Sequence, residues 1–401
     1  MNFDKLVRRG VRRLFLLTLA PFLLAPFALP SVLLWMLGVR FLNIRHLHSI
    51  GHLSLEPDCY IKEELLGAHP SHKALFLAPR NKVINRKLIE YWQQYNQYIK
   101  VISSPIYCIL LYPLTLFKWL QYDVSPYCMN DHETATCYTI YGKWGGRPSL
   151  LTLNKADHDR GWDCLKALGV PEGAWFVCVH ARQSNDKQNT AHSSRDVDIF
   201  TYLAAIEEIT NRGGWCIRLG DNAMRPLPRM KNVVDYALLD IKSEWMDVFL
   251  CASCRFFLGS SSGLSNLAGV FGAPCVLANL VPLSVRPVKN SDLGIPKLLW
   301  SEGEKRFLRF KEILDSPVGQ ANFFAPSFQE AGLTIVDNSP DEIKDLTIEM
   351  LDIIENKAVY SKNDEEMQNR FKSFFRSGHY GYGAESRVGR DFLRKHAELL
   401  L

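Results

Sequence analysis

Short apolar runs alternate with amphipathic stretches from about residue 41 onward, and the alternation occurs twice along the chain. Strands of a parallel sheet are buried on both faces and are joined by helices, so this pattern predicts two α/β units with mostly parallel sheets. In the first unit we predict strands at 43–50, 74–78 and 99–103, with helices at 56–66 and 85–95.

The second unit shows the pattern more clearly. The residues Ile199, Tyr202, Leu203, Ile206 and Ile209 lie on one face of a predicted helix that ends at a Gly-Gly pair. Five short strands in about a hundred residues, joined mostly by helices, predict a Rossmann-like domain. The predicted strands are 174–180, 215–220, 233–236, 255–258 and 275–278, and the helices are 198–212 and 243–252.

This organisation predicts four segments. They are a basic leader with an apolar segment (1–40), a first Rossmann-like domain (41–160), a second one (161–345) and a helical segment that closes back on the fold (346–401). The last segment ends in "SRVGRDFLRKHAELLL", which reads as an amphipathic helix. Two α/β domains predict a cleft, and ligands bind such sheets at the carboxyl ends of strands.

The apolar segment predicts membrane association. No charged residue occurs from Leu14 to Val39, and one helix of that length reaches about 39 Å, enough to cross a bilayer. Pro21, Pro26 and Pro30 each remove a helical hydrogen bond, so a kinked or surface-embedded segment competes with a span. A secretory signal peptide is a third reading, but no small-residue cleavage site follows.

The net charge and the cysteines indicate the cellular compartment in which the protein works. The net charge is +5, and residues 4–13 alone contribute +4, so the rest is near neutral and a nucleic-acid partner is not expected. The ten cysteines are scattered, several of them in apolar strand-like runs, which predicts reduced thiols. Cys251 and Cys254 form a CxxC pair without a second ligand pair, a weak metal signal. With a basic leader, these features predict the cytoplasmic face of the inner membrane.

One serine-rich stretch predicts an anion site. In "GSSSGLSNLAGVFGAP" (259–274), Ser260, Ser261 and Ser262 follow a predicted strand, and Gly263 permits close approach of a ligand to the backbone. Unpaired amides at a helix start and three hydroxyls suit a phosphate or diphosphate. An ordinary helix N-cap is the alternative, although one serine would suffice for it.

Two further strand ends carry polar side chains. In "VHARQSND", Arg182 has the forked charge suited to a diphosphate, and His180 projects to the same side of the strand. In "RLGD", Gly220 and Asp221 follow another strand, and Asp221 could accept from a ribose or sugar hydroxyl. A structural histidine and a turn-capping aspartate are the alternative readings.

In this order, "VHARQSND", "RLGD" and "FLGSSSGLSNLAGVFGAP" resemble the nucleotide-sugar half of GT-B glycosyltransferases, and are most similar to the fucosyltransferase-like branch. More narrowly, "IGHLSLEPDCYIKEELLG", "GGWCIRLGD", "EWMDVFLCASCRFFLGSSSGLS" and "SRVGRDFL" resemble a family of bacterial glycosyltransferases of surface-polysaccharide and lipopolysaccharide biosynthesis. The resemblance runs from about His46 to the C-terminus.

The resemblance implies a GT-B enzyme with a nucleotide-sugar donor in the second domain and a glycan or glycolipid acceptor facing the first. Arg182 would then balance the charge of the leaving diphosphate, together with the amides of the helix beginning near Ser261. No DxD motif occurs, which predicts a metal-independent enzyme without a cofactor. Gln183 and Ser184 replace the basic pair that often follows the fucosyltransferase clamp, so GDP-fucose is not the expected donor.

The first unit offers a base and two cations. We read "SIGHLSLEPD" as a strand, a turn at Gly51 and a helix start, which places His52 and Glu56 at the mouth of the cleft. His52 is the favoured base for the acceptor hydroxyl, with Glu56 and Asp58 as rivals and a packing role as the alternative. Further along, "APRNKVINRK" carries two cations that could hold an anionic lipid-linked acceptor or could simply be solvated, Arg80 and Lys82.

Three other functions remain open on the same sequence. A nucleotide-sugar epimerase and a pyruvyl transferase share this two-domain plan, and a membrane-anchored binding protein would keep the donor site without turnover. The sequence makes no prediction of the sugar, the stereochemical outcome or the oligomeric state.

Overall fold

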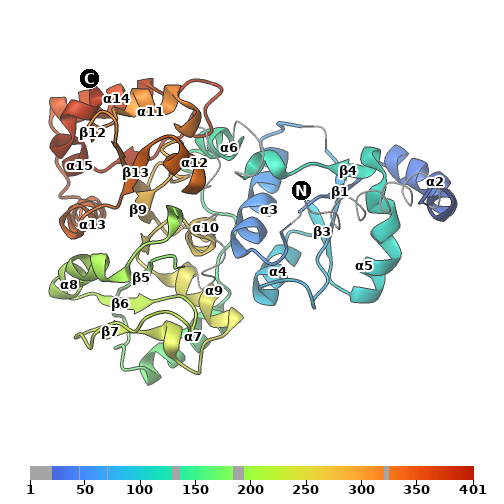
Figure 1. Cartoon of the computed structure of the whole chain (residues 1–401). Coiled ribbons are helices and arrows are strands. Elements are labelled where there is room, and N and C mark those ends of the chain that lie inside the picture. The colour runs from blue at the N-terminus through green and yellow to red at the C-terminus, as the bar shows by residue number, and fades with distance from the viewer. Residues whose placement is uncertain (1–19, 45, 70, 129–135, 184–193, 320–324) are drawn as a thin grey trace, which may run out of the picture.

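The computed structural model describes residues 20–44, 46–69, 71–128, 136–183, 194–319 and 325–401. The chain is a mixed α/β protein with parallel sheets, and its two sheet-bearing units lie side by side (Figure 1). Helices α3 and α4 of the first unit lie next to α9 and α10 of the second (Figure 1). The prediction of two α/β units with mostly parallel sheets is confirmed.

The first unit holds a four-stranded sheet of order β3-β2-β1-β4, in which all described pairings are parallel. Its strands are β1 (Val39–Leu42), β2 (Lys73–Leu77), β3 (Ile99–Ile102) and β4 (Gln121–Tyr122). The predicted strand at 43–50 is wrong. The strand lies earlier, because residues 39–42 pair with β2 and β4, and a helix already begins at Ile50.

The two helices predicted in the first unit occur, at 50–65 and 86–93, and the structure adds helices that were not predicted. The α-helices are α2 (Ala20–Met36), α3 (Ile50–Leu65), α4 (Arg86–Gln93), α5 (Pro105–Leu111) and α6 (Thr136–Trp144). The 3-10 helices are η1 (Tyr112–Leu116), η2 (Lys118–Leu120) and η3 (Ser125–Tyr127).

The second unit is built on a seven-stranded sheet of order β14-β10-β9-β8-β5-β6-β7 with parallel pairings. The five predicted strands occur in it. Its strands are β5 (Phe176–His180), β6 (Trp215–Arg218), β7 (Val233–Val234), β8 (Phe257–Gly259), β9 (Cys275–Leu280), β10 (Leu293–Pro296) and β14 (Arg387–Val388). Side chains of β5 alternate between two core clusters, with Phe176 and Cys178 in one and Val177 and Val179 in the other.

Five strands of the second unit were not predicted, and two of them, β10 and β14, belong to the large sheet. The other three form a small antiparallel sheet of order β12-β11-β13, with β11 (Leu298–Ser301), β12 (Arg306–Phe307) and β13 (Leu333–Val336). Strand β14 lies inside the C-terminal stretch predicted to be entirely helical. It pairs with β10 at the sheet edge, so a tertiary partner overrides the local helical pattern.

Helices surround these sheets. The α-helices are α7 (Lys155–Ala167), α8 (Leu203–Asn211), α9 (Glu244–Ser253), α10 (Gly263–Val270), α11 (Phe310–Asp315), α12 (Ala325–Glu330), α13 (Pro340–Ile354), α14 (Lys362–Ser373) and α15 (Arg390–Lys395). The 3-10 helices are η5 (Ile199–Tyr202), η6 (Tyr236–Leu238), η7 (Pro317–Gly319) and η8 (Ala397–Leu400). Helix α7 runs across the predicted boundary at residue 160, and α13 across the one at residue 345.

Helix α2 corresponds to most of the predicted membrane segment. It continues through Pro26 and Pro30 without ending. In the described ranges no helix has both the length and the hydropathy needed to cross a membrane. Residues 1–19, which include Leu14 and the basic leader, lie outside the described residues.

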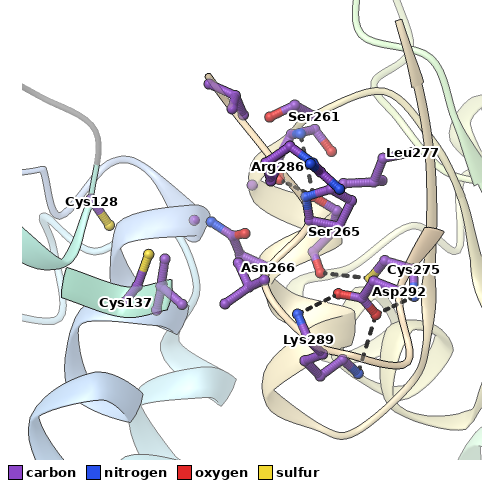
Figure 2. A pocket seen from close by; sticks show the side chains of 18 of the residues that line it. Cys128, Cys137, Ser261, Ser265, Asn266, Cys275, Leu277, Arg286, Lys289 and Asp292 are labelled. Atoms are coloured by element: carbon purple, nitrogen blue, oxygen red, sulfur yellow. Dashed lines mark hydrogen bonds and ion pairs between the residues drawn. The ribbon is translucent and has the colours of Figure 1, made fainter. Parts of the chain in front are cut away.

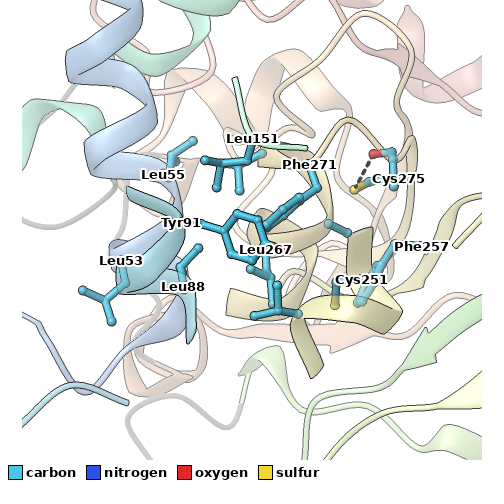
Figure 3. Close-up of a cluster of buried hydrophobic side chains, with 14 of the residues drawn as sticks. Leu53, Leu55, Leu88, Tyr91, Leu151, Cys251, Phe257, Leu267, Phe271 and Cys275 are labelled. Atoms are coloured by element: carbon cyan, nitrogen blue, oxygen red, sulfur yellow. Dashed lines mark hydrogen bonds between the residues drawn. The ribbon is translucent and has the colours of Figure 1, made fainter. Parts of the chain in front are cut away.

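One core cluster spans the two units. Leu53, Leu88 and Tyr91 of the first unit pack in the same cluster as Leu267 and Phe271 of α10 (Figure 3). The rings of Tyr91 and Phe271 meet edge to face with centroids 5.2 Å apart. Apolar packing therefore holds α10 against the first unit, which positions the start of α10 opposite the start of α3.

Candidate active site between the two units

The starts of α3 and α10 define the centre of the candidate site. Ser49 and Ser262 are the N-cap residues of these helices. Gly51 lies in the first turn of α3, so the predicted strand and turn in "SIGHLSLEPD" are wrong. Helix N-termini carry unpaired amides and a partial positive charge, so two of them at one place favour an anion.

Two cavities lie next to these helix starts. The first, of about 180 Å³, is lined by His52, Ser261, Ser262, Gly263 and Arg286, among others, and we call it the α10 cavity. The second, of about 830 Å³, we call the β5 cavity. Its lining includes three predicted donor residues together with residues of the first unit: His180, Gly220, Asp221, Ile50, Asn85, Arg86 and Lys87.

His52 and Glu56 form a pair on the first-unit side of the α10 cavity. They lie one turn apart on α3, and His52 Nδ1 is 2.6 Å from Glu56 Oε1. Glu56 is buried, and burial raises its pKa although the hydrogen bond to His52 opposes the shift. A carboxylate on Nδ1 fixes the orientation of the ring and leaves Nε2 to accept a proton from a ligand. The rival Asp58 points elsewhere, since it accepts from Lys62 and Tyr141 in the interior.

The three serines of the glycine-serine stretch have different surroundings. Ser260 is buried, and its hydroxyl accepts from the backbone N–H of Arg182 at 3.0 Å. Ser261 lines the α10 cavity, and its carbonyl accepts from Arg195 at 2.9 Å. Ser262 also lines this cavity.

The Ser262 hydroxyl bears on both readings of this stretch, the anion site and the ordinary N-cap. It is buried and has no hydrogen-bond partner among the described residues. Ser262 is the N-cap residue of a capping box with Ser265, and its backbone N–H donates to Ser265 Oγ at 3.4 Å. This is the arrangement of an ordinary N-cap, and a contact of the Ser262 hydroxyl with a ligand stays a prediction.

Cationic side chains line the second-unit side of the α10 cavity. These are Arg195, Arg286 and Lys289, and Figure 2 shows Arg286 beside Ser261 and Ser265. Arg286 is only 5% exposed, donates to the carbonyl of Ser386 at 2.8 Å and lies over the Phe371 ring. Burial lowers its pKa to about 10. In the described chain no carboxylate forms an ion pair with Arg286. A bound anion would supply the missing counter-charge.

These cations were missed at the sequence level. Arg286 follows β9 in "VPLSVRPVKN", so the rule that ligand residues come after strand ends applies to β9 as it does to β5, β6 and β8. Arg195 follows residues 184–193, which lie outside the described part of the chain. No local sequence pattern marks Arg195 as a ligand residue.

The predicted clamp Arg182 lies at the end of β5 but points to Asp196. The distance from Arg182 Nη1 to Asp196 Oδ1 is 2.8 Å. Neither the α10 cavity nor the β5 cavity has Arg182 in its described lining. A diphosphate would have to compete with Asp196 for this guanidinium, and its role as a clamp stays a prediction.

His180 is the last residue of β5 and pairs with Gly259 of β8. It lines the β5 cavity, and its Nδ1 is buried without a partner among the described residues. Burial, with the nearby Arg218, lowers the pKa of His180 to about 4, so the ring is neutral at pH 7. It can donate or accept a hydrogen bond there but cannot supply a positive charge.

Gly220 and Asp221 lie beyond the end of β6, in the lining of the same cavity. Asp221 Oδ1 accepts from the backbone N–H of Ala223 at 2.9 Å, as the turn-capping alternative predicts. Its position in the cavity lining is also what the ribose-binding reading requires. The position of Asp221 is therefore compatible with turn capping and with ribose binding.

One group of side chains has the composition of a metal site. Ligand atoms of His52, Glu56 and Cys128 lie within 4.8 Å of one another. Two ligands of a tetrahedral zinc ion lie about 3.3 Å apart, but His52 Nδ1 and Glu56 Oε1 are separated by only 2.6 Å. Burial also raises the pKa of the Cys128 thiol well above its ordinary value, which disfavours the thiolate that a metal needs. The arrangement fits a hydrogen-bonded pair beside a thiol better than a metal centre.

The predicted acceptor residues Arg80 and Lys82 lie on an exposed loop after β2. The described linings of the α10 and β5 cavities include neither. Lys82 instead lines a third cavity, in the first unit. The same loop continues to the β5 cavity through Ile84 and Asn85.

Of the known proteins compared with this chain, only solved structures are similar to it. No protein-family model matches the chain, and no curated protein matches it. A glycosyl transferase of family 9 from Veillonella parvula is similar in structure with a TM-score of 0.41 and 10% identity, over 90% of this chain and 96% of that one.

Two further similar structures are of one protein, the iron-containing dodecameric glycosyltransferase TibC from enterotoxigenic E. coli. The TM-score is 0.34 with 16% identity, over 61% of this chain and 58% of that one. A second TibC structure, of the heptosyltransferase in complex with ADP-D-beta-D-heptose, has a TM-score of 0.34 and 17% identity over 60% and 57% of the two chains. TM-scores in this range assign neither a family nor a function to the chain.

Proposed function

We propose that this protein is a GT-B glycosyltransferase that moves a sugar from a nucleotide-sugar donor to a glycan or glycolipid acceptor in bacterial surface-polysaccharide biosynthesis. One observation carries the proposal. The α10 cavity has a histidine-carboxylate pair on one side and, on the other, the start of α10 with a buried guanidinium. A base opposite an anion site is what sugar transfer from a nucleoside diphosphate requires.

The chemistry then follows from the positions of the side chains. His52 Nε2 takes the proton of the acceptor hydroxyl, and the hydroxyl oxygen forms a bond to the anomeric carbon. The bond from that carbon to the diphosphate oxygen breaks, and the nucleoside diphosphate leaves with the electron pair. Glu56 holds Nδ1–H and stabilises the imidazolium that forms. Direct displacement of this kind inverts the anomeric configuration.

The leaving diphosphate gains charge as the bond breaks. The amides of α10, the hydroxyl of Ser262 and the guanidinium of Arg286 would stabilise that charge, with Arg195 next to them. Such groups act most strongly where water is excluded, and Arg286 and Ser262 are both buried.

We place the nucleoside in the β5 cavity. Asp221 would accept from a ribose hydroxyl, and neutral His180 would exchange a hydrogen bond with the nucleoside. The predicted clamp Arg182 would reach the diphosphate by leaving Asp196. The proposal needs neither a metal nor a cofactor, because the cations named above supply the charge.

The donor nucleotide identifies where the protein works. Nucleotide sugars are made in the cytoplasm, so we propose the cytoplasmic face of the inner membrane. The exposed apolar side chains of α2, including Phe22, Leu29 and Met36, support attachment to that face.

A screen of the purified full chain against UDP-, GDP-, CMP- and dTDP-sugars tests the proposal. One class should raise the midpoint of thermal unfolding, because a ligand of the folded state stabilises it. With that donor and membrane glycolipid as acceptor, a transferase releases free nucleotide, which is a nucleoside diphosphate from UDP-, GDP- and dTDP-sugars and CMP from CMP-sugars. An epimerase would change the sugar without releasing nucleotide, and a binding protein would show the thermal shift without either product.

A further inference from the structure

The third cavity lies in the first unit and is mainly apolar. It has a volume of about 510 Å³ and lies where β1, β2, α5 and η1 meet. We call it the apolar cavity, and its lining includes Phe41, Leu42, Ile44, Leu47, Leu77, Lys82, Cys108, Ile109, Tyr112 and Leu116. None of the residues that we assign to sugar transfer lines it.

The apolar cavity is continuous with an exposed apolar face. Ile109, Tyr112 and Leu116 line the cavity and are also exposed, Ile109 to 72%. Around them α5, η1 and η2 present further large side chains to the surface, and together we call these residues the α5 face: Ile106, Tyr107, Ile109, Leu110, Tyr112, Leu116 and Trp119. Exposed apolar surface of this extent marks a binding surface in a soluble context or contact with lipid.

Helix α2 extends this face. Phe27 and Leu34 of α2 pack in one small core with Leu114 and Leu120, which follow α5. In Figure 1, α2 and α5 lie together at the end of the first unit that is remote from the second unit. The exposed side chains of α2 and the α5 face therefore belong to one end of the molecule.

The charge of this part of the chain matches an anionic bilayer. No Asp or Glu occurs from residue 5 to residue 55, from 65 to 89 or from 91 to 122. The same stretches carry Arg40, Lys82, Lys100 and Lys118. Apolar side chains with Trp and Tyr among them, in stretches whose charged residues are cations, are the composition of a surface that inserts into the headgroup region of anionic lipid.

Two short segments connect the apolar cavity to the candidate active site. In the first, Leu47 lines the apolar cavity and His52 lines the α10 cavity. In the second, Lys82 lines the apolar cavity and Ile84 lines the β5 cavity. The backbone N–H of Ile84 donates to the carbonyl of Leu47 at 2.9 Å, so the two segments are tied together. Leu47 and His52 are five residues apart, and five residues of extended chain span at most about 18 Å, so the linings of the two cavities come within that distance of each other.

We propose that the apolar cavity binds the hydrocarbon chain of a lipid-linked acceptor, drawn from an anionic bilayer on which α2 and the α5 face rest. Lys82 lies where it can meet the phosphate headgroup, and the described residues give it no ion pair. The headgroup sugar would then extend along residues 47–52 toward His52. This last step rests on the proposed function, whereas chain binding and bilayer contact do not.

Bilayer contact is tested with the full chain and vesicles of phosphatidylcholine with and without phosphatidylglycerol. The double variant Ile106→Ser, Leu110→Ser changes only exposed side chains that do not line the cavity. We expect it to lower the partition into anionic vesicles about tenfold or more. Val359→Ser, at a side chain exposed to 73% on the other unit, is the matched control and should change nothing. Equal partition of the double variant and the control would overturn bilayer contact by the α5 face.

Chain binding is tested with a long-chain alkyl phosphate that carries a diazirine, in the absence of any nucleotide sugar. Photolabelling should map to residues lining the apolar cavity. Ile109→Trp should reduce it several-fold by filling the cavity from an exposed position, and Leu77→Trp is a second filling variant. Labelling that is unchanged in both variants, or absent from the full chain because its own N-terminal residues occupy the cavity, would overturn the proposal.

Activity separates this inference from the proposed function. Ile109→Trp should lose turnover of a long-chain lipid-linked acceptor while keeping donor binding and turnover of a short-chain soluble acceptor. Normal labelling without transfer from any donor would refute the proposed function and leave the lipid site intact. Transfer to long-chain acceptors that is unchanged in Ile109→Trp would refute the lipid site and leave the transferase intact.

Discussion

The backbones of Gly51 and Gly263 touch where α3 of the first unit and α10 of the second begin. A Cβ atom on Gly263 would lie 2.7 Å from the Gly51 nitrogen, and one on Gly51 would lie 3.0 Å from the Gly263 Cα. Both approaches involve backbone atoms, which cannot rotate away. Only glycine at both positions lets the two helix starts share one site.

We therefore expect Gly263→Ala to separate the helices. Overpacking of this kind costs about 1–3 kcal/mol of unfolding free energy, and donor binding should weaken with it because the α10 amides move. Gly269→Ala in the same helix is the control, since no atom lies within 4 Å of its added Cβ. Thermal melts with and without donor measure both variants. Equal melting temperatures for the two would contradict the close contact.

His52→Asn tests the base. Removal of a general base lowers kcat by about 10²–10⁴-fold, while the donor Kd should stay unchanged because the base contacts the acceptor. Glu56→Gln should give a smaller loss of kcat and alter its pH profile, because an amide cannot stabilise the imidazolium. His48→Asn, at an exposed histidine four residues earlier, is the control. Full turnover in His52→Asn would exclude His52 as the base.

Ser260 and Ser262 should respond differently to replacement by alanine. Ser260→Ala leaves the buried N–H of Arg182 without its acceptor, a loss of about 1–3 kcal/mol in stability. Ser262→Ala removes a buried hydroxyl at a capping-box position, so it should cost less stability than Ser260→Ala while donor affinity falls. Urea unfolding and donor titration on both variants measure the contrast. A destabilised Ser262→Ala with normal donor affinity would return Ser262 to a purely structural role.

Arg182 and Asp196 form an ion pair, and substitution of each partner tests whether Arg182 binds a ligand or has only a structural role. We expect Arg182→Ala to abolish detectable transfer with the fold intact, because it removes ligand charge rather than core volume. Asp196→Ala removes this partner but keeps the charge of the guanidinium for a diphosphate. Transfer rates and circular dichroism of both variants check this. If the two variants lose activity equally, Arg182 only supports the end of β5.

The buried His180 predicts a pH dependence of stability. Its pKa falls from 6.5 to about 4 on folding, so the unfolded chain binds a proton at a higher pH than the folded one. The stability it contributes is complete above pH 6.5 and is lost as the pH falls toward 4. Between pH 7 and pH 5 the loss is about 2 kcal/mol. Urea unfolding at both pH values should show a smaller loss in His180→Asn, and the same loss in both proteins would contradict a neutral buried His180.

Some of this architecture is readable from local patterns. Runs such as Phe176–His180 and Cys275–Leu280 are apolar at every position and are bounded by turn residues, so both their strand conformation and their burial follow from composition. The rule that ligand residues follow strand ends predicted His180, Gly220, Asp221 and the serines before α10, and their binding role stays a prediction. These residues lie in or next to the cavity linings because the carboxyl ends of parallel strands meet at one edge.

What the sequence alone determined is therefore which residues lie at strand ends and which faces are apolar, because side-chain periodicity is a local property of the backbone. Only the tertiary structure decided that β1 is residues 39–42, that β14 joins the sheet, that Arg286 rather than Arg182 lines the α10 cavity, and that Gly51 meets Gly263. Each of these depends on a partner far away in the chain. Contacts of that kind are set by how whole elements pack, and no local pattern of residues records them.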